Sequence, residues 1–303
     1  MEKMKGIIKK TEKFKITLKN DYLFKRLLGV EENKDILKDF LECVLDIPEE
    51  QIMGLELLDK ELKKDKVNDR LGILDVKIRL KNGCIVDVEI QGFWDASFVG
   101  RTLFYWAKMY IEDFKEGESY SVLNKCITIN IVGKGFNLND KVHSKYILKE
   151  EKTNEKLTDI LEVHFLNLEK VEEIWKKEEI RKDRLIKWLK FINSESKEER
   201  EMIASTSLAL KILNEKIEVL NLNEEEKAIY ESRMKLKSDI ASISESRFNE
   251  GIKEGLKEGV KEGVKKGSYD AKIETARLMK KESFDTQMIV KMTGLSKETI
   301  EKL

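Results

Sequence analysis

The stretch Ile85–Gln91, IVDVEIQ, decides the fold, because from Val86 onward it alternates between apolar and polar side chains. This period of two is typical of a β-strand with one apolar face. The polar positions hold Asp87, Glu89 and Gln91, which are two acids and an amide in a row. Such a row is either a solvated face of a sheet or a place where a metal ion binds.

A second strand precedes this one at residues 73–80, ILDVKIRL, and Lys-Asn-Gly separates the two. A two-residue loop would set carboxylates opposite apolar groups all along the hairpin. A three-residue loop sets Asp75 opposite Glu89, gives the hairpin one apolar and one polar face, and places Gly83 where a left-handed residue is needed. We therefore predict the three-residue loop.

The predicted register brings the carboxylates of Asp75 and Glu89 within about 5 Å at Cβ. Two like charges in this arrangement destabilise the sheet unless a cation neutralises them. A divalent ion with oxygen ligands does so, and Mg²⁺ prefers one or two carboxylates plus substrate phosphate. The alternative is that Lys77 or another neighbouring cation pairs with the acids. Asp87 lies across from Lys77, and we expect these two side chains to pair.

Further elements follow on both sides of the hairpin and predict an α/β (mixed) or α+β fold. Two helices are expected within 20–46, broken at Gly29, with Asn20 or Asp21 as the first cap. The other expected elements are a weak strand at 54–62, a helix at 102–114, a strand at 124–133 and a strand pair within 143–168.

The chain after residue 169 is helical in pattern and highly charged. Residues 249–267, NEGIKEGLKEGVKEGVKKG, repeat every four residues and form either a helix for a partner helix or a flexible spacer. The aliphatic stripe of that helix would be Ile252, Leu256, Val260 and Val264. The last segment predicts short helices, as an interaction tail or a helix-turn-helix, with a turn at Thr293-Gly294 and a cap at Ser296. Its expected small core is Met288, Ile289, Met292, Leu295, Ile300 and Leu303.

Composition narrows the function classes. The 303 residues carry 58 basic and 58 acidic side chains, which excludes a globally basic nucleic-acid binder, although residues 1–30 hold a local excess of about +6. The three cysteines lie far apart, and the two histidines are 21 residues apart, so neither favours a zinc centre, a disulfide framework or a Ser-His-Asp triad. With no apolar run long enough for a membrane span, we expect a cytoplasmic protein that does not bind membranes.

The order of these motifs resembles the PD-(D/E)XK nucleases, and more closely their family of recombination-promoting nucleases and transposases. The matching pieces are NDYLFKRLLG (20–29), LGILDVKI (71–78), VDVEIQ (86–91), RTLFYWAKMY (101–110) and LTDILEVHFLNLEK (157–170), followed by the Gly-Lys-Glu repeat. The resemblance covers about residues 15–303. It implies a restriction-endonuclease-like core at 1–170, a helical region at 171–247, the repeat at 248–267 and a small helical tail at 268–303.

The resemblance further implies hydrolysis of DNA that depends on Mg²⁺ or another divalent cation. Asp75 and Glu89 would be metal ligands together with the Ile90 carbonyl. Gln91 stands where the superfamily usually has lysine, and it matches this family's Glu-x-Gln form. An amide can orient water or hold a phosphate oxygen, but it carries no positive charge. The missing cation could be Arg101.

Asp21, Tyr105 and Lys108 are secondary candidates for this site. Arg101, Tyr105 and Lys108 share one helix face by their spacing, although Tyr105 could be a core residue and Arg101 a surface one. Asp21 is either the auxiliary acid that these nucleases often carry on their first helix or simply a helix cap.

Three functions remain open from the sequence. The first is a DNA endonuclease of transposase-like type that promotes DNA recombination. The second is a catalytically weak or inactive DNA-binding or regulatory relative. The third is an assembly protein that forms a homodimer or a higher homo-oligomer through its C-terminal helices. Because Asp75 and Glu89 are both intact, we favour the endonuclease.

Overall fold

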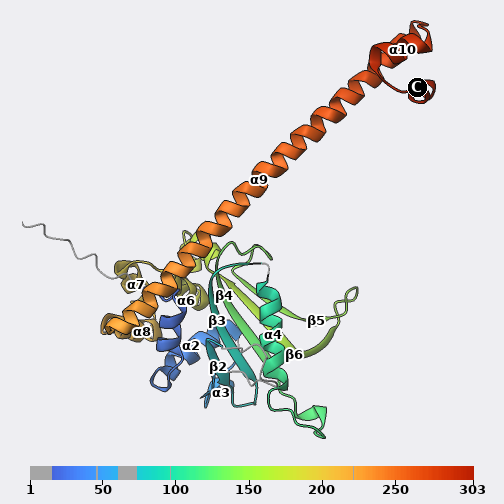
Figure 1. Cartoon of the computed structure of the whole chain (residues 1–303). Coiled ribbons are helices and arrows are strands. Elements are labelled where there is room, and N and C mark those ends of the chain that lie inside the picture. Colours follow the sequence, from blue (N-terminus) through green and yellow to red (C-terminus); the bar gives the residue numbers. More distant parts are fainter. Residues whose placement is uncertain (1–15, 46, 61–73, 96, 221) are drawn as a thin grey trace, which may run out of the picture. The chain divides into compact units, whose positions relative to one another are not determined.

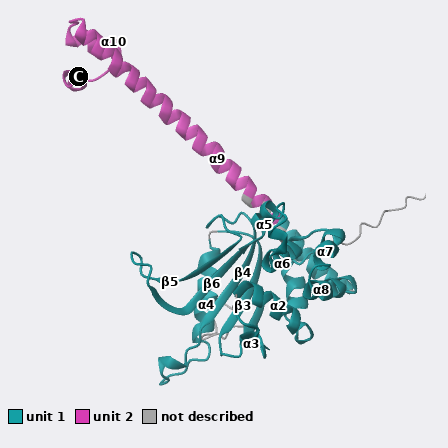
Figure 2. Ribbon diagram, turned by 180° about the vertical axis from the view of Figure 1, so that it is seen from behind, with its two compact units in different colours: residues 1–238 teal, residues 239–303 magenta. Residues whose placement is uncertain are grey.

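The computed structural model describes residues 16–45, 47–60, 74–95, 97–220 and 222–303. These residues belong to two compact units, residues 1–238 and 239–303, which are coloured separately in Figure 2. The first half of the basic N-terminal segment, and the beginning of the motif expected at 71–78, lie outside the described residues.

A six-stranded mixed sheet organises the first unit (Figure 1), with the strand order β1-β2-β3-β4-β6-β5. Strands β3, β4 and β6 are parallel to one another, and the other neighbouring pairs are antiparallel. The strands are β1 (Glu56–Leu57), β2 (Val76–Arg79), β3 (Ile85–Phe93), β4 (Cys126–Lys134), β5 (His143–Lys149) and β6 (Lys156–Asn167). The strands expected from the sequence are therefore present, and the weak one is reduced to two residues.

The register of the β2–β3 hairpin is the one that the sequence predicts. Val76 pairs with Val88 and Lys77 with Asp87, as a three-residue loop requires. Gly83 has φ +84°, in the left-handed region where glycine is favoured. The loop is closed by a hydrogen bond of 2.8 Å from the Leu80 N–H to the Cys84 carbonyl. The local turn chemistry thus fixes which side chains of the two strands face each other.

Helices cover both faces of the sheet. Helix α4 (Phe98–Ile111) connects β3 to the parallel strand β4 and lies along one face, where its Thr102 and Met109 are buried. The opposite face packs against α1 (Asp21–Leu28), α2 (Lys34–Leu45), α5 (Leu168–Ile174) and α6 (Arg184–Asn193). The apolar stripes of these helices form the main core with Val86, Val88 and Ile90 of β3 and with Ile127, Ile129 and Ile131 of β4. Two layers of helix with a sheet between them follow from strands that carry apolar groups on both sides.

Helix α1 is fixed at both ends by residues expected from the sequence. Asn20 is its N-cap, accepting a hydrogen bond from the Leu23 N–H, and its side-chain amide also donates 3.1 Å to the Tyr230 carbonyl. Of the two caps considered for this helix, the structure has Asn20. Gly29 is the C-cap, as the break in the pattern indicates.

Helices also make up the rest of the described chain, so the mixed α/β fold with helices after it is confirmed. They are α3 (Glu49–Ile52), α7 (Lys197–Ala204), α8 (Leu208–Glu218), α9 (Glu224–Lys281), α10 (Thr286–Thr293) and α11 (Lys297–Glu301), with short 3-10 turns at Glu31–Asn33, Tyr120–Val122 and Ile180–Lys182. Within the described ranges, no helix has the length and apolar character needed to cross a membrane.

The Gly-Lys-Glu repeat lies inside α9, where its aliphatic stripe is exposed. After it, a small core forms around Ala276, Ile289, Leu295 and Ile300. The turn at Gly294 (φ +70°) and the cap at Ser296 are as predicted. The expectation that Met288 and Met292 belong to this core is wrong, because they are 52% and 70% exposed. Ala276 from α9 takes their place, since α10 turns its Ile289 side and not its methionines toward α9.

Candidate active site

The polar face of the β2–β3 hairpin is buried and not solvated. Asp75, directly before β2, is 5% exposed, and Asp87 in the middle of β3 is 1% exposed, while Glu89 is half-buried. Asp87 and Glu89 share this face with Thr128 and Asn130 of β4, and helix α4 covers it, since Thr102 of α4 donates a 3.0 Å hydrogen bond to Asn130. Carboxylates in such surroundings lose most of their hydration, so they need partners or protons.

Asp75 and Glu89 lie beside each other, as their opposition across the hairpin predicts. The Asp75 N–H donates a 2.9 Å hydrogen bond to Glu89 Oε1, and the Ile90 N–H donates a 2.9 Å bond to Asp75 Oδ2. The other oxygen of Asp75, Oδ1, is 2.7 Å from the Lys25 ammonium of α1. Backbone and side chains of the two strands thus lock both acids at one point of the sheet.

The protonation of these acids is shifted by their surroundings. Burial raises the pKa of Glu89 to about 8, and the negative charge of Asp75 acts in the same direction. Burial also raises the pKa of Asp75, although the Lys25 charge and the Ile90 N–H partly oppose it. Groups whose pKa is shifted by burial and by a specific neighbour, all at one point, are typical of functional sites.

Asp87 does not pair with Lys77, so that expectation is wrong. The two residues are register partners, but the Lys77 ammonium binds Glu112 at the end of α4, at 2.5 Å. Both carboxylate oxygens of Asp87 lack a hydrogen-bond partner among the described residues, and so does the hydroxyl of Thr128 beside it. Burial raises the pKa of Asp87 well above its usual value. The cause of the error is α4, which brings an acid 35 residues away in sequence over the hairpin.

Helix α4 brings two of its three candidate residues to the site. Arg101 Nη2 donates a 3.1 Å hydrogen bond to Gln91 Oε1, and the guanidinium also lies 4.6 Å from the centre of the Phe98 ring. Tyr105 is half-buried next to the small apolar cluster under α4. Burial raises the pKa of Tyr105, and the negative charge of Glu89 raises it further. Lys108 is half-buried one turn farther along α4. The cations whose charges act to lower the pKa of Glu89 are Lys25 and Arg101.

Helix α1 contributes Asp21 and a residue that the sequence analysis did not single out, Lys25. The charge of Asp21 raises the pKa of both Asp75 and Lys25, so it lies on the same side of α1 as the site, and Arg233 approaches its Oδ2 to 3.7 Å. Lys25 follows Asp21 by four residues, which places both on one helix face. That spacing is the signal by which Lys25 could have been found.

A comparison with known families agrees with this geometry. The model of a family described as PD-(D/E)XK nuclease family transposase matches residues 18–246, which span the sheet, both carboxylates and the helices on either face. The chain belongs to this family. No curated protein and no solved structure matches it. Membership indicates a nuclease, and PD-(D/E)XK nucleases generally use divalent cations.

The donor set of this candidate site suits a hard divalent cation. Among the described residues, no group of three or more His, Cys, Asp or Glu side chains is arranged to hold a metal ion. The site instead offers the carboxylates of Asp75 and Glu89, and Mg²⁺ commonly takes one or two carboxylates while waters and substrate phosphate complete its shell. The raised pKa of both acids fits as well, because burial disfavours their negative charges and a bound cation would neutralise them.

A second buried polar cluster lies on the opposite face of the sheet of this PD-(D/E)XK protein. His143 of β5 and His164 of β6 are neighbours, with their ring nitrogens 2.7 Å apart, and the other nitrogen of His164 is 2.7 Å from Glu162. Glu162 also binds Lys125 at 2.7 Å and Lys145 at 2.8 Å. These contacts lower the pKa of Glu162, while burial lowers the pKa of His143 to about 4. The two histidines, far apart in sequence, thus meet in an ion-paired network.

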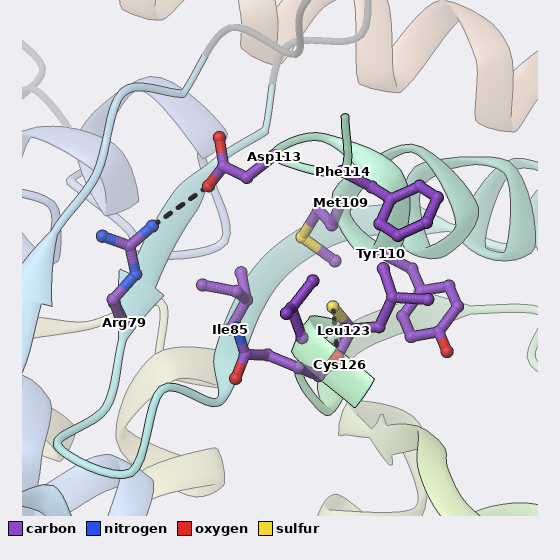
Figure 3. A pocket seen from close by; sticks show the side chains of 10 residues that line it. Arg79, Ile85, Met109, Tyr110, Asp113, Phe114, Leu123 and Cys126 are labelled. Carbon is purple, nitrogen blue, oxygen red and sulfur yellow. Dashed lines mark hydrogen bonds and ion pairs between the residues drawn. The ribbon is translucent and has the colours of Figure 1, made fainter. Parts of the chain in front are cut away.

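A small pocket lies at the other end of α4 and holds none of the candidate residues. Figure 3 shows that Ile85, Met109 and Cys126 line it and that Arg79 and Asp113 form an ion pair of 3.4 Å at its side. Asp113 is the one acid among its lining residues and is paired with Arg79, so the pocket offers no carboxylate pair comparable to Asp75 and Glu89.

Proposed function

We propose that the protein is a metal-dependent DNA endonuclease of transposase-like type that hydrolyses phosphodiester bonds and so promotes DNA recombination. One observation carries this proposal: Glu89 accepts a hydrogen bond from the Asp75 N–H across the hairpin, and the carboxylates of both residues are desolvated, with raised pKa values. An arrangement that disfavours two negative charges is poorly explained by stability alone, and a divalent cation makes it favourable. The family membership supports the same chemistry.

Asp75 and Glu89 would hold Mg²⁺ or another divalent cation, together with the Ile90 carbonyl. Such a cation lowers the pKa of a bound water and shields the charge of the scissile phosphate. Ile90 is well placed in the chain for this role, because its own N–H already binds Asp75 Oδ2. Asp21, near Lys25 and Asp75, would be the auxiliary acid.

Gln91 and Arg101 would act as a pair at the substrate. Because the Gln91 amide oxygen accepts from Arg101, the amide nitrogen is the part of Gln91 suited to donate to a phosphate oxygen or an attacking water. Arg101 in turn fixes that amide and brings positive charge close to the DNA backbone. Tyr105 and Lys108 would stay supporting residues on the same helix.

The test is a plasmid-nicking assay with the full chain and supercoiled DNA, in Mg²⁺ or in EDTA. We expect nicking in Mg²⁺ only, and a loss of at least about 100-fold in Asp75→Asn and Glu89→Gln, because the cation supplies several kcal/mol of charge stabilisation. Asp159→Asn, on an acid of β6 outside the site, is the matched control and should nick normally. Nicking that persists in both variants contradicts the proposed site. A DNA mobility shift without nicking in any metal would instead support a catalytically inactive DNA-binding relative.

Assembly into a homodimer or a higher homo-oligomer through the C-terminal helices is a separate part of the proposal. It is supported by Ile252, Leu256, Val260 and Val264, which are all exposed, next to repeat glycines with open space around them. Sedimentation of the full chain tests it, since Leu256→Glu combined with Val260→Glu should reduce the mass to that of a monomer. An unchanged mass would contradict assembly through this stripe.

A further inference from the structure

The site lacks a positive charge on the strand itself, because Gln91 stands where a lysine would supply one. Arg101 does not take that place directly, since its guanidinium is bound to the Gln91 amide at 3.1 Å and packs on Phe98. Lys77 does not take it either, because its ammonium binds Glu112. The described chain places another cation, Lys25, directly at the acids.

Lys25 is the cation that the three buried acids share. Its ammonium is 2.7 Å from Asp75 Oδ1, and its charge lowers the pKa of Asp75, Asp87 and Glu89. The charge of Arg101 acts to lower the pKa of Glu89, and that of Lys77 acts to lower the pKa of Asp87. Lys25 is also only partly exposed, at 26% of its side chain, so its charge acts through little water.

The packing of helix α1 in the main core holds Lys25 in this position. Leu23, Phe24, Leu27 and Leu28 of α1 are buried in the main core, which fixes the rotation of the helix, and the Asn20 cap fixes its start. Lys25 lies between these core residues in sequence and therefore leaves α1 on another side, toward the end of the sheet where Asp75 lies. The cation is thus set by a helix packed on the core, and the acid is held directly before β2 by its hydrogen bond from the Ile90 N–H of β3.

We propose that Lys25 is a catalytic residue that supplies, from helix α1, the positive charge at the scissile phosphate that Gln91 cannot supply. The inference rests on the proposed nuclease function. Asp75 Oδ2 already accepts from the Ile90 N–H, so Oδ1 is the oxygen that a metal ion would share with Lys25. A cation that neutralised Asp75 would weaken the attraction of Lys25 to Oδ1 and would leave its ammonium available to a phosphate oxygen of bound DNA. Lys25 then stabilises charge that develops on that oxygen during hydrolysis.

A purely structural Lys25, which only neutralises Asp75, has different consequences. Its removal would leave the rate unchanged once the metal ion is saturating, because the metal would neutralise the acid in its place. A Lys25 that acts on the phosphate is needed at every metal concentration. In both cases the lysine competes with the cation for Oδ1, so its removal should not weaken metal binding.

The experiment compares Lys25→Met and Lys25→Arg with wild type in two measurements. Calorimetric titration with Mn²⁺ should show that Lys25→Met binds the ion as tightly as wild type or more tightly. Plasmid nicking at saturating Mg²⁺ should be at least about 100-fold slower in Lys25→Met and partly restored in Lys25→Arg. Lys38→Met, which removes a lysine paired with Asp35 on the surface of α2 at 2.8 Å, is the matched control and should change neither measurement. Circular dichroism and thermal melting establish that each variant is folded.

The outcomes separate this inference from the function on which it rests. Nicking by Lys25→Met at the wild-type rate, with Asp75→Asn inactive, overturns the role of Lys25 and leaves the nuclease intact. Loss of Mn²⁺ binding in folded Lys25→Met also overturns it, because the lysine would then be a support of the metal site. If wild type fails to nick, or nicks without Asp75, the nuclease proposal fails and the role of Lys25 fails with it.

Discussion

The sheet carries two buried polar clusters on its opposite faces, and they differ in how their charges are compensated. Glu162 is surrounded by Lys125, Lys145 and His164, and these contacts lower its pKa. The acids of the other face have Lys25 as their shared cation, and their pKa values are raised. A cluster that is complete within the chain serves stability, whereas an undercompensated one has room for a charge from outside.

The largest expected effect that distinguishes the two faces is on stability. Glu162→Gln removes the acid from two lysines and a histidine, and we expect it to lower the free energy of unfolding by about 3 kcal/mol. Asp87→Asn, at an acid whose oxygens have no partner, should cost less than about 1 kcal/mol or even stabilise the fold. Urea unfolding at pH 7.5 measures both. Equal losses of unfolding free energy in the two variants would contradict the proposed difference between the two clusters.

The next effect is the pH dependence of stability without metal. Glu89 has a pKa of about 8 in the folded protein and of 4.5 in the unfolded chain. Its contribution to stability is therefore fully present below about pH 4.5 and is lost as the pH rises toward 8. Asp75 and Asp87, also raised, act in the same direction. The loss should amount to a few kcal/mol by linkage. Urea midpoints in EDTA between pH 5 and 8.5 should fall with pH, more steeply in wild type than in Glu89→Gln.

Metal ions sharpen the same test. Millimolar Mg²⁺ at pH 8 should raise the urea midpoint of wild type, because binding to the folded state alone stabilises it.

Glu162 should respond to pH in the opposite sense from Glu89, since its lowered pKa gives stability that is lost in acid. A midpoint in EDTA that is flat from pH 5 to 8.5 would contradict the raised pKa of the site.

The smallest effect concerns helix α4. Arg101→Met removes the donor that holds the Gln91 amide, and we expect nicking to slow about tenfold, or about 1.4 kcal/mol. Lys108→Met, seven residues along the same helix face, should change the rate by less than twofold. Initial rates on supercoiled plasmid measure both. A larger effect of Lys108→Met would show that the site extends farther along α4 than the contacts of Arg101 indicate.

Much of the carboxylate site could be predicted from the hairpin alone. The loop Lys81-Asn82-Gly83 sets the register, and the register puts Asp75 beside Glu89, because a strand has a strict period of two. Contacts between distant segments could not be predicted in this way. The pairing of Lys77 with Glu112 depends on where α4 ends over the sheet, and the meeting of His143 and His164 depends on the pairing of β5 with β6.

The sequence by itself determined the order of the strands and of the main helices, the β2–β3 register, the end of α1 at Gly29, the cap of α11 at Ser296 and the two acids at one point of a hairpin. These properties depend on side-chain periodicity and turn chemistry, which act over a few residues. Only the tertiary structure decided that the polar face is buried under α4, that Asp87 is without a partner among the described residues, and that Lys25 stands at Asp75. The physical reason is that desolvation and ion pairing depend on what packs over a group, and the packing elements lie tens of residues away in the chain.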